Sequence, residues 1–284
     1  MSDHQWKDCP VVIPYYGGKF QLSRELVPRL PKHERYIEMF AGGLSMFFRK
    51  KKVEWNVIND KDNNLVNLYI TLAEDFDTFC EHIDWYIKSR THHVLIKEYI
   101  SNYKSPVNPT DIPDARRAAR YYYLVKCSFN NNPQSTFSKN SGDWNTETFI
   151  KDLKIARKYL NNVTVENLDF RTLVDKYYPR EGDLWYLDPP YYVATARKDY
   201  YIHTFGENDH LDLLTICNKI NDANGKFMVS YDDNKNVHKL YNEYRIEKIP
   251  VIYAGQTTKR DYKNEIVITN YEPPAVQETM FDGV

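Results

Sequence analysis

Apolar and polar positions along the chain follow two alternating patterns. Short apolar runs end at or beside an acidic residue, and between them lie longer stretches in which apolar residues recur every three or four positions. The short runs are typical of buried strands, and the longer stretches are typical of amphipathic helices. Strands that alternate with helices predict an open α/β sheet.

Five of the predicted strands end at or beside an acid. These acids are Glu38, Asp60, Asp169, Asp188 and Asp232. In a doubly wound sheet, ligands bind outside the carboxyl ends of the strands, so we expect the five side chains to converge on one rim. The alternative is that several of them only cap the helix that follows.

The strand 184–187 runs directly into Asp188-Pro189-Pro190-Tyr191. Proline has no N–H for a sheet ladder, so the chain must leave the sheet at Asp188. The proline rings also fix φ, which sets the direction of the neighbouring carbonyls. One carboxylate, fixed carbonyl acceptors and the ring of Tyr191 suit a planar group that carries an NH2, because both protons can be accepted while the ring is stacked. The alternative is a rigid surface turn.

A glycine turn separates the strand that ends near Glu38 from a short helix. Gly42 and Gly43 form this turn, and Asp60 follows the next strand, Trp55–Asn59. Glycines beneath a cofactor and an acid for ribose hydroxyls are the layout of a nucleoside site. Because the GxGxxG spacing is missing, we expect a nucleoside cofactor without a diphosphate, and not NAD. A glycine helix entry with Asp60 as an N-cap is the alternative.

A second glycine pair lies near the amino terminus, where an apolar run opens into Gly17-Gly18-Lys19. The two glycines let the backbone approach a ligand closely, and Lys19 adds a positive charge there. The alternative is a hairpin-like turn with a solvated lysine.

The middle of the chain is mostly helical in pattern. Helices are predicted over 63 to about 103, 115–129, 149–160 and 207–223, and an antiparallel hairpin over 244–252 and 264–271. The helix 115–129 is followed by a polar segment, 130–145, that contains Phe137 and Trp144. Amide and basic side chains there suit the reading of base edges in a DNA groove, although a plain solvated loop fits as well. The candidate DNA contacts are Arg116, Arg117, Asn130, Asn132 and Lys139.

Composition narrows the function classes only slightly. With 38 basic and 39 acidic side chains, any DNA-binding surface must be a local patch. The four cysteines have no CxxC spacing, which indicates neither a zinc site nor a disulfide framework. The sequence also has no signal-like start and no apolar run of spanning length. We therefore expect a cytoplasmic protein with no metal and no membrane partner.

Four motifs occur in the same order as in the Dam-type adenine-specific DNA methyltransferases (the DPPY, alpha group), which the chain resembles from about Val11 to Tyr271. They are Tyr15-Tyr16-Gly17-Gly18-Lys19, Glu38-Met39-Phe40-Ala41-Gly42-Gly43, Asp60 and Asp188-Pro189-Pro190-Tyr191. One departure is that Tyr15 and Tyr16 stand where the family usually has tryptophan before Gly-Gly-Lys.

The resemblance implies a Rossmann-like, S-adenosylmethionine-dependent methyltransferase fold with a mostly parallel seven-stranded sheet whose last strand is antiparallel. It implies a catalytic domain of residues 1–63 and 163–272, a mainly helical target-recognition insertion at 64–162, and a flexible tail at 273–284. The implied catalytic residues are Asp188, Pro189, Pro190 and Tyr191. The implied cofactor-binding residues are Tyr15, Lys19, Glu38, Phe40, Gly42, Asp60, Asp169, Phe170 and Asp188.

The implied activity is methyl transfer from S-adenosylmethionine to the exocyclic N6 amine of an adenine flipped out of duplex DNA, in a bacterial or phage-infected cell. Alternatives are the same chemistry on RNA adenine or protein glutamine, and a catalytically silent DNA-binding regulator. The tail Gln277–Phe281 is similar to short peptides that dock on sliding clamps, and a disordered tail is the alternative. The DNA sequence recognised and a partner endonuclease stay open.

Overall fold

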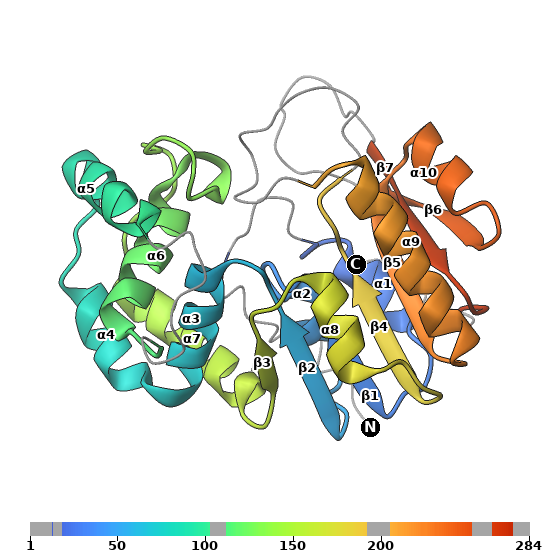
Figure 1. The fold of residues 1–284 in the computed structure, drawn as a ribbon. Coiled ribbons are helices and arrows are strands. Elements are labelled where there is room, and N and C mark those ends of the chain that lie inside the picture. The colour runs from blue at the N-terminus through green and yellow to red at the C-terminus, as the bar shows by residue number, and fades with distance from the viewer. Residues whose placement is uncertain (1–12, 14–18, 103–111, 192–204, 252–262, 275–284) are drawn as a thin grey trace, which may run out of the picture.

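A central sheet carries helices on both faces and a group of helices at one side (Figure 1). The computed structural model describes residues 13, 19–102, 112–191, 205–251 and 263–274. No helix among these residues has the length and apolar character needed to cross a membrane.

Seven strands of the described chain form one sheet in the order β3-β2-β1-β4-β5-β7-β6. Strands β1 to β5 pair in parallel, whereas β7 runs antiparallel to both of its neighbours, β5 and β6. The strands are β1 (Arg35–Glu38), β2 (Trp55–Asn59), β3 (Thr164–Glu166), β4 (Asp183–Leu187), β5 (Lys226–Asp232), β6 (Arg245–Val251) and β7 (Lys263–Thr269). The expected mostly parallel sheet with an antiparallel last strand is confirmed.

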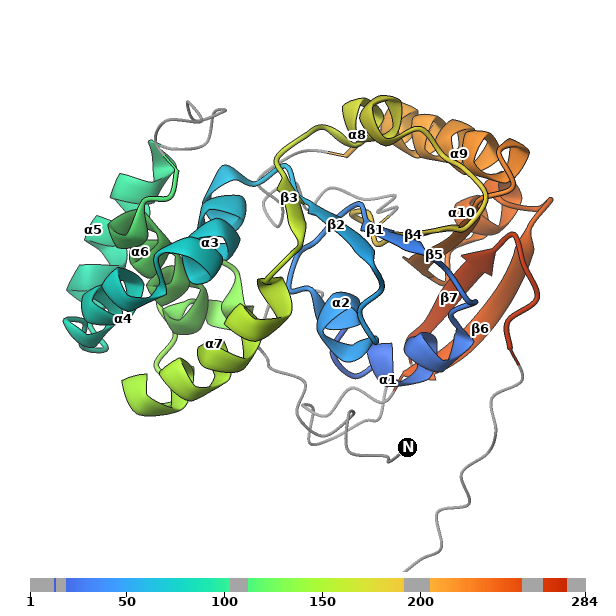
Figure 2. The same cartoon turned by 90° about the horizontal axis from the view of Figure 1, so that it is seen from below.

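Helices cover both faces of the sheet because alternate strand residues point to opposite sides and both sides are apolar. Ile37, Trp185 and Leu187 pack toward α8 and α9, whereas Tyr36 and Leu184 belong to the core on the other face, with α1 and α2 (Figure 2). The helices beside the sheet are α1 (Ser23–Leu26), the 3-10 helix η2 (Val27–Arg29), α2 (Ser45–Arg49), α8 (Phe170–Tyr177), α9 (Glu207–Asp222) and α10 (Lys235–Leu240).

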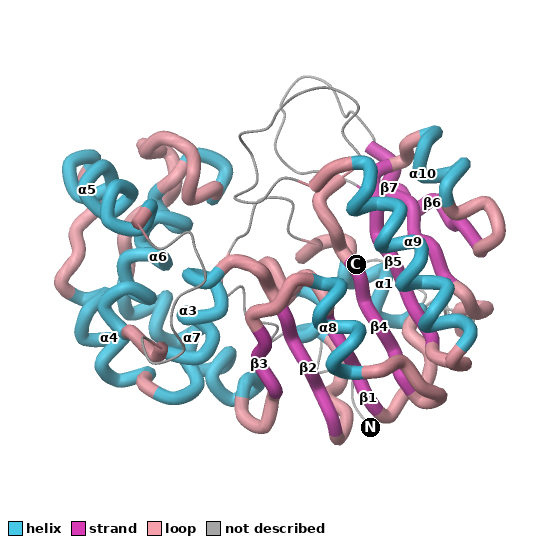
Figure 3. The backbone as a smooth tube through the Cα atoms, viewed as in Figure 1, coloured by secondary structure: helices cyan, strands magenta, loops and turns pink. Residues whose placement is uncertain are grey.

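In the described part of the segment between β2 and β3, the regular elements are helices, and in Figure 3 these helices form a group beside β3. Its helices are α3 (Asn63–Glu74), α4 (Phe76–Asp84), α5 (Arg90–Ser101), α6 (Ala115–Cys127), the 3-10 helix η4 (Phe129–Asn131) and α7 (Thr146–Leu160). The stretch predicted as helical from 63 to about 103 is therefore three helices. The first break is at Asp75, whose φ of −135° is not helical and which separates α3 from α4. The second break separates α4 from α5, which begins after Ser89, whose side chain accepts the His92 N–H.

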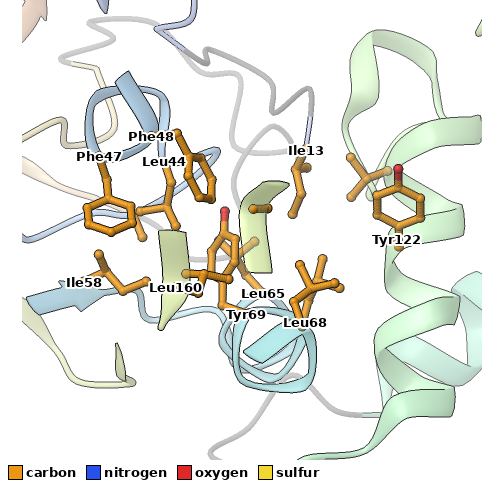
Figure 4. Packing of buried hydrophobic residues seen from close by; sticks show 14 of the residues in the cluster. Ile13, Leu44, Phe47, Phe48, Ile58, Leu65, Leu68, Tyr69, Tyr122 and Leu160 are labelled. Carbon is orange, nitrogen blue, oxygen red and sulfur yellow. The ribbon is translucent and has the colours of Figure 1, made fainter. Parts of the chain in front are cut away.

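Helix α3 joins this helical segment to the sheet. Leu65 and Tyr69 of α3 lie in one apolar cluster with Phe47 of α2 and Ile58 of β2 (Figure 4). The same cluster continues through Tyr122 of α6. The insertion and the sheet thus share a continuous core, which fixes the insertion beside the carboxyl ends of the strands.

A buried ion pair at the opposite end of the strands gives a test of the β1–β4 register. Arg35 and Asp183 are register partners and both are buried, and the Arg35 Nε donates to Asp183 Oδ1 at 2.8 Å. We expect Asp183→Ala to lower the free energy of unfolding by about 3–5 kcal/mol, because it leaves the guanidinium buried without its counter-charge. Urea unfolding measures the change. The control is Arg245→Ala, which breaks the exposed pair with Glu272 and should change stability by less than about 1 kcal/mol. Equal effects of the two variants would contradict the buried pairing.

Candidate active site

The carboxyl ends of β1, β2, β4 and β5 lie at one edge of the sheet. Glu38 is in register with Ile58 of β2 and Tyr186 of β4, and Leu187 is in register with Val229 of β5. The residues that follow these ends therefore meet at that edge, as the sequence predicts. Among the described residues, no group of three or more His, Cys, Asp or Glu side chains is arranged to hold a metal ion.

Asp188 is the centre of a largely buried polar cluster. Its Oδ1 lies 3.1 Å from the Nζ of Lys19 and accepts a hydrogen bond of 2.9 Å from the Ser230 hydroxyl. Lys19 also donates to the Tyr191 hydroxyl at 2.5 Å, and its Nζ lies 3.7 Å from Glu265 Oε2. One ammonium group thus links the carboxylate and the aromatic ring of the predicted catalytic motif.

Burial sets the protonation of this cluster. Desolvation raises the pKa of Asp188, while the charge of Lys19 lowers it and the charge of Glu265 raises it again. Behind Asp188, Glu38 is buried and accepts a hydrogen bond of 2.7 Å from the Tyr36 hydroxyl. Burial raises the pKa of Glu38 to about 8, against that hydrogen bond, and the charge of Asp188 acts in the same direction as burial. The edge of the sheet is therefore rich in carboxyl groups, and a cationic ligand bound there would favour their ionised forms against the effect of burial.

The glycine turn after β1 is held by Asp60. The Asp60 Oδ2 accepts the N–H of Gly42 at 2.9 Å, and its Oδ1 accepts the N–H of Asp62 at the same distance. Gly42 has a φ of 45°, a conformation that glycine adopts without strain. The N-cap of α3 is Asp62, not Asp60. The Asp60 carboxylate thus stabilises the turn through backbone hydrogen bonds.

Three phenylalanines gather beside this turn. The ring centroids of Phe40 and Phe170 are 5.7 Å apart, and Phe205 lies 6.1 Å from the first and 5.6 Å from the second. Asp169 caps α8 by accepting the Arg171 N–H, so the capping alternative holds for this residue. Partial burial opposes ionisation of Asp169, but hydrogen bonds from Lys61 and Arg171 lower its pKa below the ordinary value.

The segment after α6 is a compact loop with several anchors. Ser128 and Phe137 form an isolated antiparallel bridge, and the loop carbonyls of Gln134 and Ser135 accept hydrogen bonds from Lys97. Phe137 packs against His93.

Trp144 is likewise packed within the insertion. Its ring packs against Tyr122, Tyr123 and Phe149.

The predicted DNA contacts divide into exposed and buried groups. Arg116, Asn130 and Lys139 are exposed. Arg117 has no exposed surface, because one residue further along α6 rotates the side chain by about 100° into the insertion. Asn132 is buried too, and its Oδ1 accepts the Gln134 N–H. Burial therefore disfavours direct DNA contact by these two side chains.

Some functional candidates escaped the sequence reasoning. Ser230 and Glu265 contact the Asp188 cluster, Phe205 joins the phenylalanine group, and Phe129 is 57% exposed on the loop after α6. The alternation of side chains along β5 places Ser230 on the same face as Asp232, and this pattern could have identified Ser230 from the sequence. Two predicted sites, Tyr15 and Gln277–Phe281, lie outside the described residues.

Comparison with known proteins gives a consistent family. The family described as D12 class N6 adenine-specific DNA methyltransferase matches residues 15–254. The modification methylase StsI of Streptococcus sanguinis is 24% identical over 92% of this chain and 42% of its own length. The type II methyltransferase M.FokI of Planomicrobium okeanokoites is 24% identical over 91% of this chain and 42% of its own length.

A phage protein matches as well. The DNA N-6-adenine-methyltransferase of Escherichia phage P1 is 22% identical over 84% of this chain and 32% of its own length. The chain thus spans less than half the length of these curated relatives. Because the family match covers most of the chain, from Tyr15 to beyond the Asp188 motif, the chain belongs to the family of D12 class N6 adenine-specific DNA methyltransferases.

Proposed function

We propose that this chain transfers a methyl group from S-adenosylmethionine to the N6 amine of an adenine in duplex DNA. The observation that carries the proposal is that Lys19 contacts both Asp188 and Tyr191, at the carboxyl ends of the parallel strands. A carboxylate and an aromatic ring held together there match the two needs of a planar amine, which are acceptors for its protons and a surface for stacking. Family membership supports the same reaction.

The acidic edge fits the cofactor. S-adenosylmethionine carries a sulfonium and an ammonium group, and when bound it supplies an electrophilic methyl group. Carboxylates that outnumber the basic groups around Asp188 suit such a cation. For its nucleoside half we propose Phe40, Asp60, Asp169 and Phe170. For binding the remainder of the cofactor we propose Tyr15, Lys19, Glu38, Gly42 and Asp188.

The chain's own groups would make a poor nucleophile reactive. The lone pair of an adenine amine is spread into the ring, and acceptance of its two protons by Asp188 and the Pro189 carbonyl draws that lone pair back to nitrogen. The amine nitrogen would then be placed to accept the electrophilic methyl group that the cofactor supplies, and Asp188 or water would take up one N–H proton. Positioning in line supplies most of the acceleration.

For the DNA-binding part we propose the helical segment 64–162. Arg116, Asn130 and Lys139 remain the candidate contacts, and the exposed ring of Phe129 joins them. Extrusion of the base costs a few kcal/mol, which contacts to the backbone and the groove offset. The anchored loop favours recognition because little of its freedom is lost on binding.

The catalytic proposal is tested first at Asp188. We expect Asp188→Ala to lower methyl transfer to duplex DNA by about 10²–10⁴-fold, since a positioned proton acceptor contributes that much. Transfer of labelled methyl to duplex, RNA and protein extract measures both rate and substrate class, and thermal unfolding confirms that the variant folds. A folded Asp188→Ala chain with normal transfer would refute the mechanism.

The DNA-binding proposal is tested with surface charges. We expect Arg116→Ala and Lys139→Ala each to weaken duplex binding and to reduce the slope of log affinity against log salt concentration by about 1. Binding titrations at several salt concentrations measure the slope. Lys219→Ala serves as the control, because it removes an equally exposed charge from α9, where Lys219 pairs with Asp175. If all three variants shift the slope alike, the proposed contact surface is wrong.

A further inference from the structure

The two oxygens of Asp188 have different surroundings. Oδ1 is taken by the ammonium of Lys19 and the hydroxyl of Ser230. Oδ2 accepts no hydrogen bond from the part of the chain that the structure describes, and about a fifth of the Asp188 side chain is exposed, at 20%. One oxygen is therefore held by the protein, and the other keeps its lone pairs for a further partner.

A count of hydrogens gives the Ser230 bond a direction. A serine hydroxyl has one proton, and an ionised carboxylate can only accept, so Ser230 donates to Asp188. The Tyr186 hydroxyl, 2.9 Å from Ser230 Oγ, must then donate to Ser230. Both residues are buried, at 2% and 0% exposure. The result is a one-way chain from Tyr186 through Ser230 to Asp188, in which each bond strengthens the next.

Glu265 contacts Lys19, which is the second partner of Asp188 Oδ1. It lies on β7, in register with Asp232 of β5, and its Oε2 is 3.7 Å from Lys19 Nζ. Lys19 is thereby drawn between two carboxylates and the Tyr191 hydroxyl. Without these contacts the Asp188 carboxylate would rotate about its terminal torsion, which has a broad energy profile.

We infer that Ser230, Tyr186 and Glu265 are positioning residues that hold Oδ1 of Asp188 so that Oδ2 accepts the proton of the target amine. The inference rests on the proposed function, which makes Asp188 the acceptor. It assigns no contact with the substrate to the three residues. Their effect is on the orientation of one carboxylate, and orientation governs the rate of an in-line transfer.

The test uses Ser230→Ala and Tyr186→Phe in the full chain. We expect Ser230→Ala to lower kcat by about 10- to 100-fold with little change in the KM for DNA or cofactor, since misplaced groups cost rates of that order. Tyr186→Phe should give a smaller loss of the same kind. Tyr177→Phe is the control, because it removes the hydroxyl of a mostly buried tyrosine, 9% exposed, that donates to a different carboxylate, Glu166.

The pH profile separates positioning from a structural defect. Burial raises the pKa of Asp188 and the Ser230 hydrogen bond lowers it. Loss of that bond raises the pKa further, so the acid limb of kcat should move to higher pH and the deficit should shrink as pH rises. The other charges around Asp188, which are Lys19, Glu38, Asp232 and Glu265, remain in the variant.

A second readout is independent of turnover. The carboxyl of Asp188, labelled with carbon-13 and assigned with Asp188→Asn, should titrate at higher pH in Ser230→Ala than in the wild type and Tyr177→Phe. If the wild type methylates DNA but Ser230→Ala keeps the wild-type kcat, acid limb and carboxyl titration, the inference fails and the proposed function stands. A wild-type chain that methylates no adenine would overturn the proposed function, and the inference with it.

Discussion

The contact on which the site depends is the largely buried pair of Lys19 and Asp188. A lysine with 5% exposure would be unstable without counter-charges, and here they come from Asp188, directly after β4, and from Glu265 of β7. The same ammonium donates to Tyr191. Because one charged group satisfies all three partners, the strand ends, the proline turn and the aromatic ring keep a single arrangement.

That arrangement requires the fold around it. Parallel pairing of β1, β2, β4 and β5 brings their carboxyl ends to one edge, and the prolines after Asp188 force the chain out of the sheet at that edge. The antiparallel insertion of β7 between β5 and β6 then brings Glu265 beside Lys19. The shared core through α3 ties the helical insertion to the sheet.

Much of this organisation is visible in the sequence because it depends on local rules. Prolines after an apolar run end a strand, a glycine pair makes a turn, and acids at strand ends meet in a parallel sheet. The side-chain directions within the insertion are not local in this way. Arg116 and Arg117 are adjacent on α6, and only the packing of that helix decides which of them reaches solvent.

Hydrogen-bond partners that lie far apart in the chain are likewise not visible in the sequence alone. Ser230 lies 42 residues from Asp188, and their hydrogen bond follows from the β4–β5 register, which the sequence does not state. The packing partners of Phe137 and Trp144 also lie on other elements of the insertion, so their partial burial could not be predicted from the polar loop alone.

The claim that Asp188 faces an extruded adenine is tested most directly by a crystal structure of the full chain with a methylatable duplex and S-adenosylhomocysteine. The account predicts an adenine outside the duplex, with its N6 within hydrogen-bond distance of Asp188 Oδ2, its ring against Tyr191, and the Ser230 to Oδ1 bond intact. An adenine bound elsewhere, or an Asp188 that faces it through Oδ1 with the Ser230 bond broken, would contradict the account.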